Sequence, residues 1–146
     1  MTIHIKSDPK NNIVYAGIDK IKFRHMKGLR GAMYDIGNEV KSTLKKRVLA
    51  TGGRTGIYYK YKGTSIRASA ANEDPANRSG KLERSIDYGV RGYSQVEFGS
   101  RTKHGLYLER GTKHMKPRRF IERVANDKAL QFATTIYHIT KRELGA

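Results

Sequence analysis

The spacing of the apolar residues changes twice along this chain, and that change restricts the fold more than any other feature. From Leu29 to Val48 an apolar residue recurs at every third or fourth position, which is the period of an amphipathic α-helix. From Gly56 to about residue 100 the period is two, which is typical of strands. A second helical stripe follows, made of Ile121, Ala125, Ala129, Phe132, Ile136 and Thr140. We therefore predict one α+β domain over residues 1–146, with a long N-terminal helix and a C-terminal helix packed on an antiparallel β-sheet of hairpins.

Residues that favour turns give the approximate bounds of the first elements. Residues 1–17 hold short alternating apolar runs broken by Pro9, which predicts an extended N-terminal arm or an edge strand. The first long helix is expected to begin between Asp19 and Leu29. It is expected to end at Thr51-Gly52-Gly53, because glycine suits the left-handed residue that follows a helix.

Two hairpins and two helices are expected after this point. The first hairpin joins Ile57–Tyr61 to Ser65–Ser69 through a turn at Lys62-Gly63. The second hairpin joins residues 81–90 to residues 94–100 and places Ile86, Tyr88 and Val90 on one face. The chain then forms a short helical turn at His104–Arg110 and a last helix over Arg118–Leu144, with Pro117 just ahead of it, where its missing N–H is not needed.

Charge is the feature that says most about partners. The chain has 30 Lys and Arg residues against 13 Asp and Glu, a net charge of +17. Such a protein attracts polyanions through the release of counterions, whatever their sequence. The chain has no cysteine, which excludes disulfides and thiolate metal sites and suits a reducing compartment. It has neither the apolar core of a signal peptide nor a run of 18 apolar residues, so we expect neither secretion nor a membrane-spanning segment.

The sequence contains no pattern typical of a catalytic, cofactor or metal site. The five histidines are scattered, and none forms an i,i+4 pair on a predicted helix. The stretch "GGRTG" at residues 52–56 lacks the spacing of a phosphate-binding loop and follows a helix instead of a strand. The central acids Glu83, Asp87, Glu97 and Glu109 are expected to pair with arginines. We therefore predict that the chain is not an enzyme and holds no cofactor or metal.

Two other segments are candidate contact surfaces. Tyr58, Tyr59, Tyr61 and Tyr93 either stack on nucleic-acid bases or pack half-buried against the sheet, and the second interpretation is favoured because tyrosine commonly packs in this way in hairpins. The loop Ala70–Gly80 has little apolar content, so we expect it to contact another subunit or line the axis of an assembly.

Two blocks in the second half resemble one known family. Residues 66–86, "IRASAANEDPANRSGKLERSI", and residues 105–121, "GLYLERGTKHMKPRRFI", resemble the tail-completion, or minor neck, proteins of long-tailed bacteriophages. That family has an R-A-S-A-P-G-E-x-P-A-N-x-[ST]-G-x-L-x-x-S-I block, then Y-A-x-x-[LV]-E-[FY]-G-T, then a Pro-x-x-Phe start of the last helix. The residues that match are Arg67-Ala68-Ser69-Ala70, Pro75-Ala76-Asn77, Ser79-Gly80, Leu82, Ser85-Ile86, Leu108-Glu109, Gly111-Thr112, Met115, Pro117 and Phe120.

The resemblance covers roughly residues 50–125 and has departures. "AANED" stands where the family has its Pro-Gly-Glu turn, Gly105 stands where the family often has Ala, and Arg110 stands where it has Phe or Tyr. These changes affect how the loop and the Glu-Gly-Thr turn contact partners more than they affect the fold.

The resemblance implies a structural virion protein without catalytic activity. The resemblance implies a homo-oligomeric ring, expected to be hexameric, between a head-side stopper or adaptor protein and a tail terminator or tail tube protein. Double-stranded DNA passes through the bore and is contacted without sequence specificity. The implied location is the neck of the virion, after assembly in the host cytoplasm.

Three alternatives stay open at this point. A tail terminator, which joins tail to head, also makes rings of α+β subunits. A sequence-nonspecific basic nucleic-acid-binding protein is favoured by the charge alone. A toxin-like ribonuclease would depend on His104 or His114.

The segment Leu106–Phe120 contributes most candidate interface residues. Glu109 leads into a tight turn at Gly111-Thr112, and Lys116, Arg118 and Arg119 are expected to project from the first turn of the last helix. The helix dipole opposes cations there by about 0.3–1 kcal/mol each, so we predict a compensating anion outside the subunit. The residues predicted to face a protein neighbour or DNA are Glu109, Lys113, Lys116, Arg118, Arg119, Arg67, Arg78, Arg101 and Lys103.

Overall fold

The computed structural model describes residues 2–8, 13–19, 26–50 and 54–143. These residues form a four-stranded antiparallel sheet of order β1-β2-β6-β5, a separate two-stranded sheet of β3 and β4, and four helices. The elements are β1 (Thr2–Asp8), β2 (Ile13–Asp19), α1 (Met26–Leu49), β3 (Tyr58–Tyr61), β4 (Thr64–Arg67), α2 (Lys81–Ser85), β5 (Ile86–Arg91), β6 (Gln95–Ser100), α3 (Lys103–Arg110) and α4 (Phe120–Glu143).

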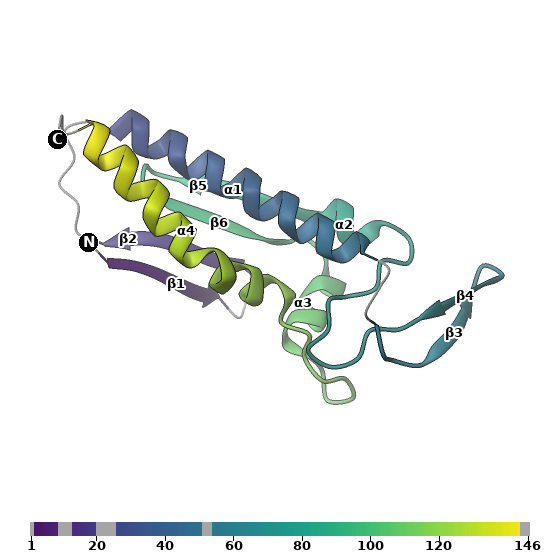
Figure 1. Ribbon diagram of the computed structural model, residues 1–146. Helices are drawn as coiled ribbons and strands as arrows, with labels where there is room; N and C mark the ends of the chain where they lie inside the picture. Colours follow the sequence, from purple (N-terminus) through teal and green to yellow (C-terminus); the bar gives the residue numbers. More distant parts are fainter. Residues whose placement is uncertain (1, 9–12, 20–25, 51–53, 144–146) are drawn as a thin grey trace.

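The two long helices lie side by side in opposite directions across one face of the four-stranded sheet (Figure 1). Helix α1 contacts β5 and β6, and α4 contacts β1 and β2. The core between them includes the fully buried side chains Leu29, Met33, Val40, Leu44, Val48, Ile86, Val96, Phe98, Phe120, Ile121, Val124 and Phe132. Burial of each larger apolar side chain stabilises the fold by roughly 1.5–3 kcal/mol. The α+β prediction is confirmed.

Helix α1 buries the stripe that its spacing predicts, from Leu29 to Val48. It begins at Met26, inside the expected range, and the expected stop at residues 51–53 lies outside the described residues. Gly37 lets the helix approach β5 closely, because a Cβ atom there would lie only 2.1 Å from Cδ2 of Tyr88. The Tyr88 hydroxyl donates a 2.9 Å hydrogen bond to Oδ1 of Asn38, which fixes the ring over the helix.

Helix α4 buries most of its predicted stripe, but its start was predicted wrongly. The helix begins at Phe120, two residues after the expected Arg118. Arg119 lies just ahead of it with φ of 35°, in the left-handed region, so the helical backbone does not extend back to Pro117. Pro117 therefore belongs to the preceding loop and is not the first residue of the helix.

The backbone decides between the two alternatives for the N-terminal segment and corrects one further prediction. Residues 2–8 and 13–19 form β1 and β2, and β2 pairs with β6, so the edge strand is confirmed for β1 and the extended arm is wrong. Lys81–Ser85, expected to be the start of a strand, forms α2, which begins after Gly80 in the left-handed conformation with φ of 72°. A helix of five residues is too short to show a period in the sequence.

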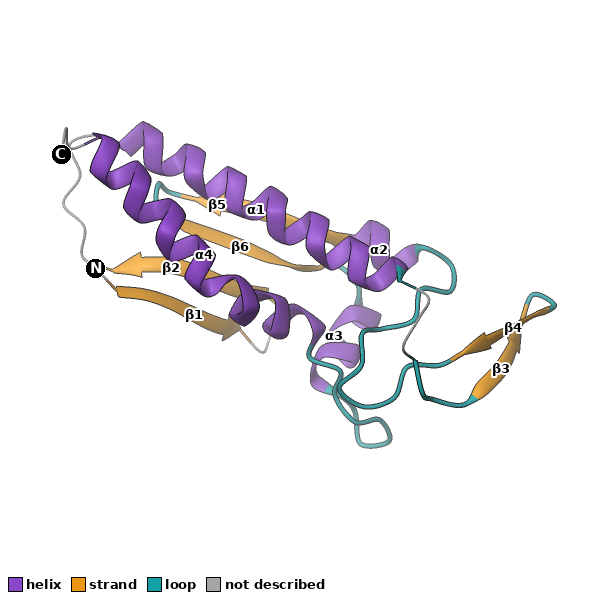
Figure 2. Ribbon diagram, viewed as in Figure 1, coloured by secondary structure: helices purple, strands orange, loops and turns teal. Residues whose placement is uncertain are grey.

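The hairpin β3–β4 projects from the rest of the molecule, beyond α2 and α3 (Figure 2). Its turn is the predicted one, since Lys62 and Gly63 have φ of 49° and 80°, the signs of a type I′ turn. The expected packing of its tyrosines against a sheet is wrong for Tyr58, which is 66% exposed, whereas Tyr59 and Tyr61 are half-buried.

Candidate docking surface

The two sequence blocks that resemble the phage family contact each other directly. Nη2 of Arg118 donates a 2.6 Å hydrogen bond to the carbonyl oxygen of Ser69, and the N–H of Asn72 donates to the carbonyl oxygen of Pro117 at 3.2 Å. Arg123, two residues after the second block, donates to the carbonyl oxygen of Asn72 at 2.6 Å and contacts Asp74 at 3.3 Å. Residues 66–86 and 105–121 therefore build one end of the molecule together.

The loop Ala70–Gly80 is held by the carboxylate of Glu73. This carboxylate accepts hydrogen bonds from the N–H groups of Thr55 and Ala70, at 3.0 Å and 2.7 Å, and from the Thr55 hydroxyl. These bonds, the Thr55 hydroxyl foremost, lower the pKa of Glu73 to about 2. Asn72 has φ of 61° and stands where the resembled pattern has glycine. Asparagine tolerates this conformation better than most residues, so the departure keeps the turn.

Glu109 faces inward, which corrects its prediction as a docking residue. It is 8% exposed, and its two oxygens accept hydrogen bonds from the N–H groups of Ile121, at 3.0 Å, and Glu122, at 2.9 Å. Burial raises the pKa of the Glu109 carboxyl, and the two backbone hydrogen bonds oppose this. Glu109 thus satisfies N–H groups at the start of α4 that have no partner within the helix.

The tight turn predicted after Glu109 is present. Gly111 has φ of 77°, and a Cβ atom there would lie 2.5 Å from the carbonyl oxygen of Met115, so no other residue fits without a shift. Thr112 and Met115 then pair as an isolated β-bridge and close the loop.

Arg118 also differs from its prediction, because it is half-buried and bonded within the subunit. Besides the bond to Ser69, its Nη1 lies 2.7 Å from Sδ of Met115, and its N–H donates to the carbonyl oxygen of Leu108 at 2.8 Å. Arg119 is exposed and lies 4.0 Å from Glu122, a contact that contributes little in solvent. Of these two arginines, only Arg119 faces outward.

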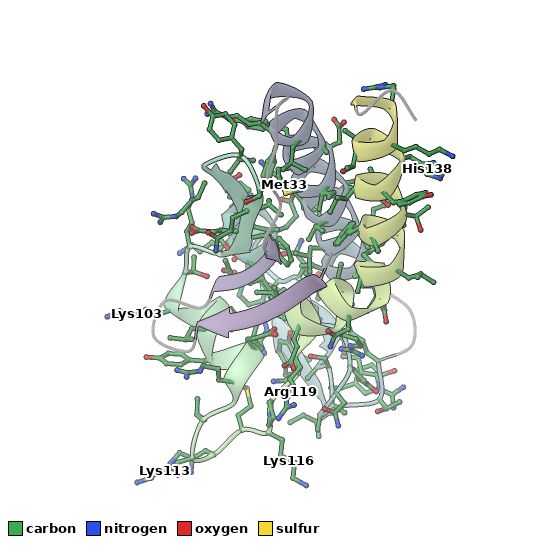
Figure 3. The ribbon with its side chains drawn as sticks, turned by 90° about the vertical axis from the view of Figure 1, so that its left-hand side faces the viewer. Met33, Lys103, Lys113, Lys116, Arg119 and His138 are labelled. Carbon is green, nitrogen blue, oxygen red and sulfur yellow. The ribbon has the colours of Figure 1, made fainter. Side chains whose placement is uncertain are left out.

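The other predicted basic residues are exposed. Lys113 and Lys116 extend from the loop between α3 and α4, away from the body of the molecule, and Lys103 extends from the start of α3 (Figure 3). The guanidinium groups of Arg67 and Arg78 lie over tyrosine rings of the hairpin, and Arg101 pairs with Asp87.

Several cations of the long helices, by contrast, are neutralised within the fold. Four ion pairs join α1 or α4 to another element: Lys41–Asp87 at 2.9 Å, Lys45–Glu83 at 3.0 Å, Arg47–Asp127 at 2.6 Å and Lys128–Glu39 at 2.6 Å. Among the described residues, Lys103, Lys113 and Lys116 form no ion pair. The predicted pairing of central acids with arginine is confirmed for Asp87 and Glu97, whereas Glu83 pairs with lysine.

A hollow of about 300 Å³ lies at the same end, lined by Ala76, Asn77, Arg78, Ser79, Lys81, Leu82, Thr102 and His104. Burial lowers the pKa of His104, and the charges of Arg78 and Arg118 lower it further. The hollow thus has cationic side chains at its edge, Arg78 and Lys81. Sequence reasoning selected Arg78 but missed Lys81, since nothing in the local pattern says that α2 and α3 begin side by side.

We call the end built by the two blocks, the loop 111–119 and the hairpin β3–β4 the basic end. In the part of the chain described, no group of three or more His, Cys, Asp or Glu side chains is arranged to hold a metal ion. No helix there has the length and apolar character needed to cross a membrane. No protein-family model, curated protein or solved structure matches this chain.

Proposed function

We propose that this chain is a structural protein of the phage head–tail connector, a tail completion subunit that forms a ring between the head stopper and the tail terminator. The genome passes through the ring, which contacts it without sequence specificity and catalyses no reaction. The observation that carries the proposal is the basic end. The two blocks that resemble the family interlock there, and the loop between α3 and α4 presents Lys113 and Lys116, which pair with none of the described acids.

The charge of the subunit supports two kinds of partner. Duplex DNA carries one charge per about 1.7 Å of axis, so a ring roughly 30 Å deep faces on the order of twenty phosphates. Six subunits of net charge +17 bring about one hundred excess positive charges, which is more than this DNA needs. Much of the basic end is therefore assigned to acidic faces of the neighbouring neck proteins, where complementary charge selects the partner and speeds association.

Charge reversal at the loop between α3 and α4 tests the proposal. In phage particles that carry the double variant Lys113→Glu and Lys116→Glu, we expect free heads and free tails to accumulate. The matched control is Lys46→Glu with Lys141→Glu, which changes the net charge by the same amount at exposed positions of the long helices. It should leave head–tail joining intact. Both sites are exposed, so circular dichroism should show folded protein in each case.

Imaging decides the remaining alternatives. Electron microscopy of assembled particles should trace this chain into the neck, and a neck that lacks it ends the proposal. A chain found in the last ring of the tail itself would be a tail terminator. Purified protein that cleaves RNA, with cleavage lost in His104→Ala or His114→Ala, would establish a nuclease instead.

A further inference from the structure

The hairpin β3–β4 is anchored at its root and exposed along its length. At the root, the N–H of Gly56 donates to the carbonyl oxygen of Ala68 at 3.1 Å, and the Arg78 guanidinium lies 4.0 Å from the centre of the Tyr59 ring. Beyond the root the two strands pair only with each other. A two-stranded hairpin of this size is marginally stable alone in water, so a contact outside the subunit would stabilise it.

The exposed side chains of the hairpin are both apolar and cationic. Ile57 is 79% exposed and Tyr58 is 66% exposed, and exposed apolar groups on a projecting segment are typical of a contact surface. Residues 54–72 include four basic residues and no acid. Lys60 lies on β3 and Lys62 occupies the first position of the rigid turn at the tip, so both ammonium groups are presented to solvent.

The described part of a second copy of this chain offers these lysines almost no free acid. Among the side chains described between residues 28 and 142, every Asp and Glu except Asp35 is already engaged within the subunit. Those in ion pairs are Glu39, Asp74, Glu83, Asp87, Glu97, Glu122 and Asp127. Glu73 and Glu109 are engaged by hydrogen bonds. The described acids of a second copy therefore give little charge complementarity, which favours an anion that is not this protein.

We propose that the hairpin is a finger that contacts the phosphate backbone of double-stranded DNA, with Lys60 and Lys62 each reaching a phosphate. Lys60 lies on β3 and Lys62 follows two residues later in the turn, so both ammonium groups are carried near the tip of the hairpin. The contact has no sequence specificity, because the ammonium groups bind phosphates and do not contact the bases. The inference rests on the proposed function for the place of DNA in the particle, but the contact itself belongs to the single subunit.

Salt dependence of DNA binding by the full chain tests the finger. Fluorescence anisotropy with labelled 30-base-pair duplexes of two unrelated sequences is measured for wild type, for Lys60→Gln with Lys62→Gln, and for the control Lys46→Gln with Lys141→Gln. Both variants lose two positive charges. The hairpin variant should lower the slope of log K against log salt by about 2 and weaken binding of both duplexes about tenfold or more near 0.1 M salt. The control should keep the wild-type slope.

Each other result has a defined meaning. Equal losses in the two variants, or no loss in the hairpin variant, overturn the finger. If the hairpin variant binds DNA like wild type but fails in head–tail joining, the hairpin contacts a protein. This result contradicts the DNA contact and agrees with the proposed function. If the hairpin variant lowers the slope of log K against log salt as expected, but imaging shows that the chain is absent from the neck, the DNA contact is supported and the proposed function is wrong.

Discussion

Replacement of Glu109 by alanine should destabilise the subunit before it affects any partner. The carboxylate is buried and accepts hydrogen bonds from the N–H groups of Ile121 and Glu122 at 3.0 Å and 2.9 Å, so the variant leaves one buried and one partly buried donor without an acceptor. A buried donor left without its partner costs about 1–3 kcal/mol. We therefore expect Glu109→Ala to lower the free energy of unfolding by about 2–5 kcal/mol.

The isosteric variant separates the hydrogen bonds from the charge. Glu109→Gln keeps one carbonyl oxygen as an acceptor and fills the same volume, so it loses about one hydrogen bond and the interaction of a carboxylate with the helix dipole. Because burial already raises the pKa of Glu109, ionisation here has a cost that the amide avoids. Glu109→Gln should therefore lower the free energy of unfolding by about 1–2 kcal/mol, less than Glu109→Ala.

Urea denaturation followed by circular dichroism at neutral pH measures these differences, with the slope checked for two-state behaviour. The control is Glu122→Gln, which removes a carboxylate from the same helix turn at a more exposed position and should cost less than about 1 kcal/mol. Equal stability of Glu109→Ala and wild type would refute the reasoning. Loss of head–tail joining alone would then restore Glu109 as a docking residue.

Three further outcomes follow from the contacts around this end and the first helix. Since the pKa of Glu73 is lowered to about 2, its stabilising effect is present above about pH 4.5 and lost as pH falls toward 2, so denaturation curves of wild type and Glu73→Gln should converge on acidification. Gly37→Ala should destabilise the fold by about 1–3 kcal/mol, because the new Cβ meets the Tyr88 ring. Gly31→Ala should stabilise the fold by about 0.5–1 kcal/mol, because nothing lies within 4 Å of the new Cβ. Thermal unfolding compares the two variants with wild type. Asn72→Ala should cost about 1–2 kcal/mol in the same assay because φ is 61°, and Asn72→Gly should restore most of it.

Local pattern was enough to predict the elements that bury long stripes. The spacing from Leu29 to Val48 and from Ile121 to Ile136 predicts two helices whose apolar faces are indeed buried, and a Lys-Gly turn predicts the first hairpin. These signals are local because each depends on the period of one element. The strands β1 and β2 were less evident, since a short alternating run does not reveal that β2 will pair with β6.

The candidate site was predicted less well because its residues are defined by contacts distant in sequence. Nothing near Glu109 indicates that its carboxylate will reach the start of α4. Likewise, nothing near Arg118 indicates that its guanidinium will bond to the carbonyl oxygen of Ser69, 49 residues earlier. Gly37 similarly appears only as a weak point of a helix until Tyr88 is placed beside it. Lys113 is exposed, as expected of a charged side chain without an internal partner, and its contact with a neighbour or DNA stays a prediction.

The basic end therefore divides its residues between two tasks. Several residues that match the phage pattern hold this end together: Glu109 binds the start of α4, Gly111 closes the loop, and Arg67 donates to the carbonyl oxygen of Gly56 at the root of the hairpin. The outward cations Lys113 and Lys62 lie outside the matched positions. Changes at the matched positions should then reduce the free energy of unfolding, whereas changes at the outward lysines should alter partner binding and its salt dependence in a protein of unchanged stability. A lysine variant that unfolds at lower urea concentration than wild type would contradict this division.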